Sequence, residues 1–335
     1  MKLLLLGGTE FVGRAIAEDA LARDWDVTVF HRGRHEPPAG TRSLHGDRTA
    51  PGGLDALTGP DTWDLVVDTW SAAPTAVRDA ARLLRDRAGR HVYISSRSVY
   101  ADPDPADPAV DRAGAEAMPL VDGSPDAPAT AYAEDKRGGE LAALDAFGDR
   151  TLLVRAGLIL GPYENVGRLP WWLTRMAEGG PVLAPGPYDL PIQYIDVRDL
   201  AHWTLDTAEA GLGGAYDLVS PSGHATMGSF LDACAAVTGG TADLRWTDPQ
   251  RILDAGVQPW TELPVWFPPG EDHASVHGAD VSKAVSAGLR CRPVEDTVAD
   301  TWAWLETLGG SAPLRPDRTA KGLDRERERS LLAGS

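Results

Sequence analysis

Cysteine is scarce in this chain: Cys234 and Cys291 are the only two among 335 residues. Neither belongs to a CxxC pair or to a Cys/His cluster with zinc spacing, so the sequence predicts neither a metal site nor a disulfide framework. Reduced, structural thiols are typical of a cytosolic enzyme, and a cytoplasmic location is the expectation.

Long apolar runs and an excess of positive charge are also missing. The N-terminal run Leu3 to Leu6 stops at Gly7-Gly8, far short of the ~18 apolar residues that a membrane helix needs, and is expected to be a buried strand. The formal net charge of −17 repels phosphate backbones and anionic membranes. We therefore expect a small-molecule substrate and neither a nucleic-acid nor a membrane partner.

Short apolar runs do alternate with helical patterns over residues 1–160. Strands are expected at 3–6, 27–30, 43–46, 64–70, 91–96 and 151–160, with helices at 11–22, 74–88 and 131–147. Buried strands separated by helices are typical of a parallel sheet covered on both faces. The expected fold is α/β, with a Rossmann-type doubly wound parallel sheet over residues 1–162 and a smaller C-terminal substrate-binding part.

The pattern loosens after Gly161-Pro162. Helices are expected at 171–180, 226–238 and 296–310, with a strand leading into a helix over 192–211 and a Pro- and Trp-rich loop or lid at 259–275. Residues 163–310 are expected to be mainly a substrate-binding or lid region whose strands and helices return to the Rossmann core. Residues 311–335 are expected to be a charged, partly disordered tail.

Residues 7–13, GGTEFVG, fall between an expected strand and an expected helix. A dinucleotide fold places glycines there for the tight turn and for close approach to pyrophosphate, and the helix N-terminus attracts the phosphates. Glu10 replaces the usual middle glycine, so its side chain is expected to point to solvent. A plain strand-to-helix turn is the alternative. The expected cofactor contacts are Gly7, Thr9, Glu10, Phe11, Val12 and Gly13.

The end of the second strand bears on the choice between NAD and NADP. NAD enzymes usually place a carboxylate there, whereas this chain has His31, Arg32 and Arg34. Arg32, supported by Arg34, is suited to hold a 2′-phosphate, so we expect NADP(H) rather than NAD(H). Arg34 is equally compatible with a solvated surface charge. Asp47 is placed either to meet the adenine or to cap its own loop.

Tyr132 and Lys136 stand four residues apart in YAEDK, which puts them on one face of a helix. A nearby ammonium stabilises a phenolate, so such a tyrosine exchanges a proton with a carbonyl or alcohol near neutral pH. The strand at 91–96 ends in SSRSVY, and a serine at that end faces the crevice where ligands bind in such sheets.

Together, GGTEFVG, SSRSVY, YAEDK and RAGLILGP (155–162) resemble the extended short-chain dehydrogenase/reductase superfamily, which includes the NAD-dependent epimerase/dehydratase group. The Glu-containing loop resembles atypical members, and the resemblance covers roughly residues 1–240. It implies that Tyr132 is the acid/base, that Lys136 binds the nicotinamide ribose and tunes Tyr132, and that Ser96 is the catalytic serine, with Ser95 or Ser98 as register alternatives. It also implies cofactor contacts from Thr69, Trp70, Ser71, Ser95, Ala156, Gly157 and Leu158. By analogy, a homodimer is an expectation.

Two departures from the resemblance bear on the substrate. Nucleotide-sugar members usually carry an Asn where this chain has Leu158, and Arg97 stands where dehydratases carry an acidic pair beside the serine. We therefore expect an NADP(H)-dependent carbonyl reductase or alcohol dehydrogenase acting on a small or ring-containing metabolite. The alternatives are a nucleotide-sugar epimerase or dehydratase with tightly bound NAD, and a non-enzymatic, RNA-associated protein on the same fold.

Substrate contacts are expected from Arg97, Trp171, Gln193 and Tyr194. Together with Trp171, residues Trp172, Trp260 and Trp266 are candidates for an aromatic wall, with core packing as the alternative for each. His273 and His277 have the i, i+4 spacing of metal ligands, but they lack an evident third ligand and fall in an expected loop, so no metal is expected. The Arg-, Ala-, Asp- and Gly-rich usage suggests a bacterial source, where such enzymes often serve specialised metabolism.

Overall fold

The computed structural model describes residues 1–101, 119–316 and 322–333 of the chain. Its residues fall into two units that interleave along the sequence. Unit 1 comprises Met1–Gly157, Val197–Leu218 and Asp280–Arg290, and unit 2 comprises Leu158–Asp196, Val219–Ala279 and Cys291–Ser335. None of the helices in the described ranges is long and apolar enough to cross a membrane.

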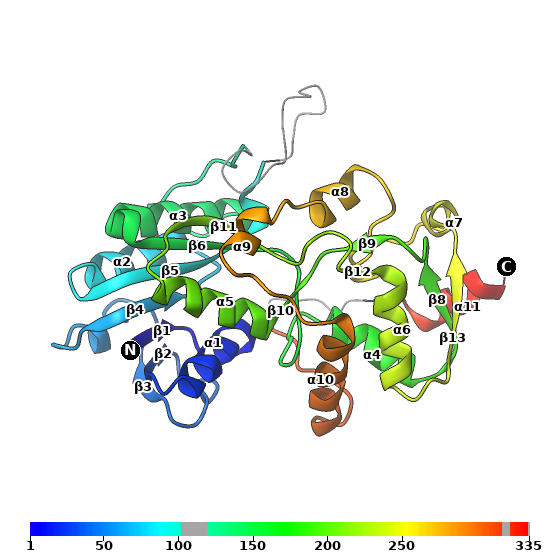
Figure 1. The fold of residues 1–335 in the computed structure, drawn as a ribbon, viewed down its shortest axis with the longest axis horizontal. Coiled ribbons are helices and arrows are strands. Elements are labelled where there is room, and N and C mark those ends of the chain that lie inside the picture. The colour runs from blue at the N-terminus through cyan, green and yellow to red at the C-terminus, as the bar shows by residue number, and fades with distance from the viewer. Residues whose placement is uncertain (102–118, 317–321, 334–335) are drawn as a thin grey trace. The chain divides into compact units, whose positions relative to one another are not determined.

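Within the described part of unit 1, seven parallel strands form one sheet in the order β11-β6-β5-β4-β1-β2-β3 (Figure 1). Leu3 of β1 pairs with Val27 and with Leu65, and both faces of β1 are buried. This order is that of a doubly wound Rossmann sheet, as the sequence predicts. The strands are β1 (Lys2–Leu6), β2 (Asp26–His31), β3 (Arg42–His45), β4 (Trp63–Asp68), β5 (Ala88–Ser96), β6 (Thr151–Ala156) and β11 (Gly214–Leu218).

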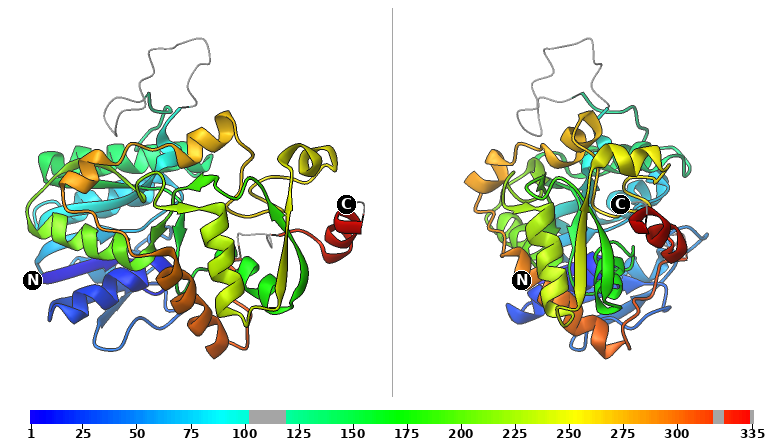
Figure 2. Two further views of the ribbon diagram at one scale, coloured as in Figure 1. Left: turned by 45° about the vertical axis from the view of Figure 1, so that its right-hand side comes forward. Right: turned by 90° about the vertical axis from the view of Figure 1, so that its right-hand side faces the viewer.

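Helices cover both faces of this sheet, which explains why central strands such as β1 and β4 are largely apolar. Helices α2 (Pro74–Leu84) and α3 (Tyr132–Phe147) pack together on one face, and α1 (Phe11–Ala22) and α5 (Val197–Glu209) on the other (Figures 1 and 2). Pro74 suits the first turn of α2 because its missing N–H has no intrahelical partner there. Unit 1 also contains η1 (Asp55–Leu57), η2 (Arg97–Val99), η3 (Gly148–Arg150) and α9 (Ser282–Ser286).

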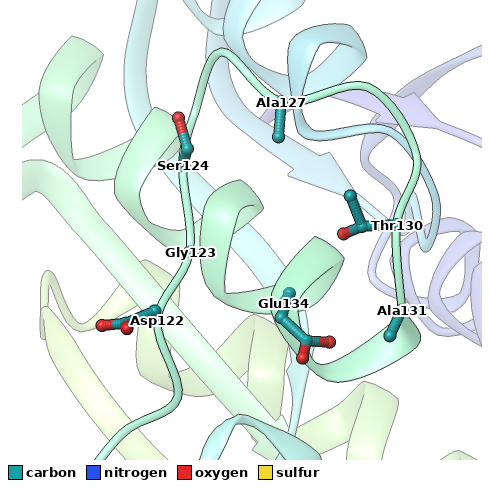
Figure 3. Close-up of a pocket in the computed structure, with 7 residues that line it drawn as sticks. All are labelled: Asp122, Gly123, Ser124, Ala127, Thr130, Ala131 and Glu134. Carbon is teal, nitrogen blue, oxygen red and sulfur yellow. The ribbon is translucent and has the colours of Figure 1, made fainter.

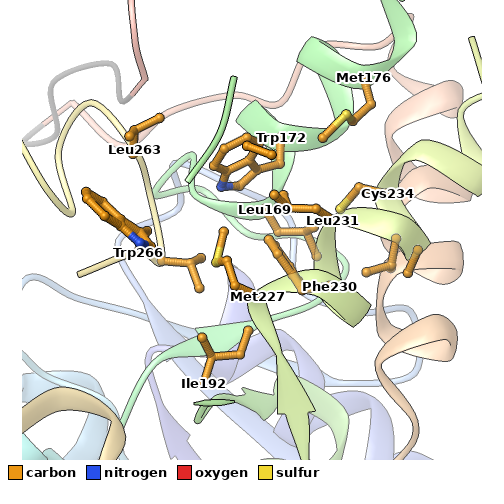
Figure 4. Close-up of a cluster of buried hydrophobic side chains, with 14 of the residues drawn as sticks. Leu169, Trp172, Met176, Ile192, Met227, Phe230, Leu231, Cys234, Leu263 and Trp266 are labelled. Carbon is orange, nitrogen blue, oxygen red and sulfur yellow. The ribbon is translucent and has the colours of Figure 1, made fainter. Parts of the chain in front are cut away.

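Unit 2 has its own hydrophobic core, built where α4, α6 and α10 meet (Figure 4). Trp172 and Trp266 are fully buried in it, and their indole N–H groups donate to the carbonyls of Pro264 (2.8 Å) and Gly186 (3.1 Å). Its elements are β7 (Ile159–Leu160), α4 (Leu169–Ala177), β8 (Gly180–Pro185), β9 (Pro191–Ile192), β10 (Ile195–Asp196), β12 (Ala225–Thr226), α6 (Met227–Val237), β13 (Ala242–Thr247), α7 (Pro249–Asp254), α8 (Glu271–His277), α10 (Val294–Thr307) and α11 (Arg325–Ala333).

The structure differs from three sequence expectations. The strand expected at 151–160 breaks at Gly157 into β6 and β7, which belong to different units. The expected loop at 259–275 instead supplies Trp266 to the core of unit 2 and contains most of α8. In the C-terminal segment, Arg325–Ala333 forms α11, because the buried carboxylate of Glu328 pairs with Arg175.

Candidate active site

The glycine turn after β1 is tied to its neighbours through its backbone. The amide of Gly7 donates to the Phe30 carbonyl (3.0 Å), and the hydroxyl of Thr69 lies 3.0 Å from the Gly7 carbonyl. Gly7 has φ +96°, which favours glycine. A Cβ on Gly13 would lie 1.9 Å from the Gly7 oxygen, so only glycine lets α1 pack this closely on the turn.

Glu10 and Phe11 join this turn to α1. Glu10 is extended, and its side chain is 43% exposed and lies 3.6 Å from His35, so the prediction that it points to solvent is confirmed. Phe11 takes the left-handed conformation at φ +34°, a strained geometry of the kind found at ligand sites. Because the first turn, Phe11 to Arg14, carries no carboxylate, the positive end of the helix dipole suits a pyrophosphate. The turn therefore fits a dinucleotide.

At the end of β2, two exposed arginines lie near enough to Asp47 to affect the pKa of its carboxyl group. Arg32 and Arg34 are exposed. Hydrogen bonds from the Thr49 hydroxyl and amide lower the pKa of Asp47, and the charges of Arg32 and Arg34 lower that pKa further. His31 is buried, with its Nε2 3.1 Å from the Ser43 hydroxyl and its Nδ1 accepting from the Gly33 amide (3.2 Å).

Tyr132 is the first residue of α3 and is 43% exposed. Lys136, one turn later, is buried. Its Nζ donates to the carbonyls of Trp70 (2.7 Å) and Ile94 (2.6 Å) and lies 4.9 Å from the centre of the Tyr93 ring. The ammonium thus joins α3 to the loop after β4 and to the end of β5.

The serines at the end of β5 point in different directions, as strand geometry requires. Ser96 Oγ accepts from the Ser98 amide (3.1 Å) and donates to the Ser98 hydroxyl (3.1 Å). The Ser95 hydroxyl is buried and donates to Glu140 (2.8 Å). Ser96 therefore ends β5 at the start of η2, whereas the hydrogen bond of Ser95 accounts for its burial without any cofactor.

The loop after β4 is held by an ion pair that the sequence pattern did not reveal. Arg48 donates two hydrogen bonds to the buried Asp68 (2.7 and 2.6 Å), whose Oδ1 also accepts from the Trp70 amide (2.9 Å). Burial acts to raise the pKa of Asp68, but the charge and hydrogen bonds of Arg48 outweigh it and leave that pKa lowered. The signal in the sequence is Asp68 itself, because a carboxylate inside an apolar strand needs a cationic partner.

The remaining predicted cofactor residues lie on both sides of a unit boundary. Thr9 and Val12 belong to the glycine turn, and Ser71 directly follows Trp70 in the loop after β4. Ala156 ends β6, and the amide of Gly157 donates to the Leu218 carbonyl at the end of β11 (3.1 Å). Leu158 is buried in the core of unit 2.

The predicted substrate residues are divided between the units. Arg97, in unit 1, has its Nε 3.8 Å from Asp217 Oδ2. In unit 2 the side-chain amide of Gln193 donates to the carbonyls of Ser220 and Ala279 (both 2.9 Å) and accepts from the Ala279 amide. These bonds account for the burial of Gln193 without a substrate.

The other two predicted substrate residues, Trp171 and Tyr194, pack against other side chains of unit 2. Trp171 makes an edge-on contact with Trp172 at 4.6 Å between ring centres and packs under the guanidinium of Arg325. Tyr194 is buried in the core of unit 2. Of the proposed aromatic wall, Trp172 and Trp266 are core residues, and Trp260 stacks on Phe267.

His273 and His277 lie on α8 rather than in a loop. The Nδ1 of His277 accepts from the Gln193 amide (3.0 Å), so in the neutral ring its Nε2 carries the proton and donates to the Val265 carbonyl (2.9 Å). His273 Nε2 lies 2.8 Å from the Pro191 carbonyl. Over the described ranges, no three His, Cys, Asp or Glu side chains are grouped to hold a metal ion.

A pocket of about 560 Å³ lies beside the start of α3 (Figure 3). It is lined by the loop before α3, at Asp122, Gly123, Ser124, Ala127, Thr130 and Ala131, and by Glu134 on the first turn. The backbone and side chain of Thr130 both donate to Asp135 (2.8 and 2.9 Å). This loop thereby fixes the backbone that leads into Tyr132.

The sequence of this chain matches a protein-family model and is similar to a known epimerase. A model of the NAD dependent epimerase/dehydratase family matches residues 3–217. The UDP-glucose 4-epimerase of Corynebacterium glutamicum is 24% identical to this chain, and the match covers 92% of this chain and 97% of that protein.

Solved structures with the same fold include two epimerases described as complexes with NAD. The UDP-glucuronic acid 4-epimerase of Bacillus cereus has a TM-score of 0.63 at 15% identity, covering 92% of this chain and 99% of its own. The UDP-glucose 4-epimerase of Thermus thermophilus has a TM-score of 0.61 at 19% identity, covering 90% and 99%.

These findings overturn the expected NADP(H)-dependent carbonyl reductase. The sequence relative and the two solved structures are UDP-sugar epimerases, and the two solved structures are described with NAD, so the expected carbonyl reductase or alcohol dehydrogenase is wrong. Arg32 and Arg34 are exposed, and Leu158 is buried in the core of unit 2. The family match spans well over half of the chain and includes the turn, Ser96, Tyr132 and Lys136. The chain belongs to the NAD dependent epimerase/dehydratase family, a group of enzymes within the extended short-chain dehydrogenase/reductase superfamily.

Proposed function

We propose that this chain is an NAD-dependent epimerase of a UDP-sugar. The observation that carries the proposal is the buried ammonium of Lys136, which is fixed on the Trp70 and Ile94 carbonyls one helical turn after Tyr132. Its support from relatives is the UDP-glucose 4-epimerase that matches nearly the full length of this chain. Ser96, at the end of the strand that contains Ile94, completes the catalytic set.

In this proposal, Tyr132, Ser96 and Lys136 have different tasks. The phenolate of Tyr132 accepts the proton of the sugar hydroxyl whose carbon is oxidised and later returns it to the same oxygen. The Ser96 hydroxyl donates a hydrogen bond to that oxygen, and the Lys136 ammonium stabilises the phenolate and binds the ribose of the cofactor. NAD, when bound, supplies a reversible hydride acceptor, so no external oxidant or reductant is consumed.

We favour an epimerase over a dehydratase because of Arg97. Loss of water from a sugar needs an acid to protonate the departing hydroxyl and a base to take the proton from the neighbouring carbon. Arg97 follows Ser96 where such a carboxyl group would stand, and it lies near Asp217. We propose NAD as the cofactor because the solved epimerases of the same fold are described with it.

The test is direct. The purified protein is denatured and the released dinucleotide is identified by chromatography, and the native protein is incubated with UDP-glucose, UDP-galactose and UDP-glucuronic acid in turn. We expect bound NAD and interconversion of one of these sugars with its 4-epimer without net change in absorbance at 340 nm. Stoichiometric NADP in place of NAD, or no epimer from any UDP-sugar with NAD bound, would contradict the proposal.

A further inference from the structure

Glu140 is a buried carboxylate that the proposed chemistry leaves without a task. It lies on α3, one turn after Lys136 and two turns after Tyr132, so the three side chains share one face of the helix. Glu140 is fully buried. A buried carboxylate persists only where donors replace the water that it has lost, so its partners indicate what it holds in place.

Four donors from three elements converge on this carboxylate. Oε1 accepts from the Ser95 hydroxyl (2.8 Å) and from Arg155 Nε (2.8 Å), and Oε2 accepts from Arg155 Nη2 (2.9 Å) and Arg137 Nη1 (3.0 Å). Ser95 precedes Ser96 at the end of β5, and Arg155 precedes Ala156 at the end of β6. One carboxylate thus joins α3 to the carboxyl ends of two neighbouring strands.

The connection continues to a third strand. Arg155 Nη1 lies 3.1 Å from the Tyr100 hydroxyl, and that hydroxyl donates to Asp217 on β11 (2.8 Å). Asp217 is also the carboxylate beside Arg97, directly after Ser96. The chain of bonds therefore starts on the helix of Tyr132 and returns to the segment of Ser96.

Helix α3 is held against β5 at two points one helical turn apart. Lys136 is bonded to the Ile94 carbonyl, and Glu140 is bonded to the Ser95 hydroxyl. Ser96 is the next residue of the strand. A shift of α3 along β5 would have to break both bonds, so together they fix how far the Tyr132 hydroxyl lies from the Ser96 hydroxyl.

We propose that Glu140 is a positioning residue, which acts through Ser95 and Arg155 to set Tyr132 against Ser96. The inference rests on the proposed function, because the readout is turnover by that pair. A positioning residue affects the reaction step far more than binding, because a misplacement of about 1 Å at the reacting groups costs about 100-fold in rate.

The test compares Glu140→Gln with Glu328→Gln. Glu328 is the matched control in unit 2: it is also buried, accepts from an arginine (Arg175, 2.8 Å) and accepts from the Leu183 amide (3.0 Å). In each variant the new NH₂ group meets donors, so we expect both to lower the Tm. Only Glu140→Gln is expected to lower kcat, by about 100-fold, with KM and NAD affinity changed less than about threefold.

Ser95→Ala keeps the test decisive if Glu140→Gln does not fold. It removes one of the four bonds, and we expect kcat to fall roughly tenfold with little loss of stability. A crystal structure of either variant with NAD should show the two catalytic hydroxyls displaced from their wild-type separation, a readout that needs no turnover.

Equal Tm losses in Glu140→Gln and Glu328→Gln with kcat unchanged in both would overturn the proposal, as would Ser95→Ala with full kcat and unmoved hydroxyls. Failure of the proposed function gives a different pattern, in which the wild type itself makes no epimer. The crystallographic comparison then still decides whether Glu140 positions Tyr132.

Discussion

The buried carboxylates of the two units have different neighbours. In unit 1 the buried carboxylates Asp68, Glu140 and Asp217 lie on or beside the carboxyl ends of strands, next to the candidate catalytic residues, and arginines contact all three. In unit 2, Asp196 is also buried at the end of a strand, β10, and lies 3.7 Å from Arg292, whereas Glu164 accepts from amides at the start of α4 and Glu328 lies on α11. In unit 1 the carboxylates that contact arginines surround the predicted catalytic residues, whereas the Glu328–Arg175 pair of unit 2 joins α11 to α4.

The largest effect expected from this comparison is on turnover. Tyr132→Phe removes the proton-transferring hydroxyl, so kcat should fall about 1,000-fold, within the usual range for general acid–base catalysis, while NAD affinity stays within about twofold. Tyr188→Phe is the control in unit 2, because Tyr188 is also exposed and its hydroxyl donates to Asp232 (2.6 Å). The rate of UDP-sugar epimerisation gives kcat for both variants. Comparable losses of kcat in the two would contradict the assignment of the reaction to unit 1.

The fold of unit 1 was predictable because its strands and helices are encoded by residues close together in the sequence. Strands buried on both faces must be continuously apolar, so LLLL and VTVF were visible as β1 and β2, and the glycine turn followed directly. Tyr132 and Lys136 were predictable for the same reason, since their relation depends only on helix geometry. Arg155 and Glu140 were missed, although an arginine in the apolar run TLLVRA signals a buried partner.

Unit 2 was less predictable because its elements depend on distant partners. Strand β13 alternates partly buried with exposed residues and pairs with β8, some 60 positions earlier. Helix α11, RERERSLLA, has the composition of a solvated tail. Its order depends on Glu328 meeting Arg175, 153 residues away, and no local pattern encodes that contact.

Breaking the buried Glu328–Arg175 ion pair of unit 2 should lower stability rather than turnover. Glu328→Ala leaves the buried guanidinium of Arg175 without its carboxylate, which should cost about 3–5 kcal/mol of unfolding free energy. The loss should appear in hydrogen exchange of α4 and β8, while NAD affinity, which the proposed function assigns to the turn in unit 1, stays unchanged. The double variant Arg175→Met with Glu328→Leu should recover most of the loss, because it removes both charges. Loss of NAD binding in Glu328→Ala would contradict the expectation that this ion pair affects only the stability of unit 2.

The smallest expected effect is a pair of opposite pH dependences. Burial lowers the pKa of His91 in unit 1 to about 4. Over the described residues neither ring nitrogen has a hydrogen-bond partner, and the ring packs on Phe147. Below the usual histidine pKa of about 6.5, His91 binds a proton in the unfolded chain but stays neutral in the folded chain. The stability of unit 1 is therefore lost as pH falls from about 6.5 towards 4.

Glu164 in unit 2 has the reverse dependence. Burial raises its pKa to about 7, although it accepts from the amides of Arg168 (2.6 Å) and Leu169 (3.1 Å) at the start of α4. The folded chain keeps a proton that the unfolded chain releases, so the stability of unit 2 is present below about pH 4.5 and is lost as pH rises through 7. Each group accounts for about 3 kcal/mol over its window.

Between about pH 4.5 and 6.5 these two contributions have opposite slopes, and single substitutions should separate them. His91→Leu should leave stability that falls with rising pH, and Glu164→Gln should leave stability that rises. Urea denaturation across this range measures the slope, and hydrogen exchange of β5 and α4 assigns it to a unit. His202→Leu is the control, because that imidazole lies on the surface, 63% exposed. If both variants kept the pH profile of the wild type, His91 and Glu164 would be hydrated, and these two groups would give the units no difference in pH dependence.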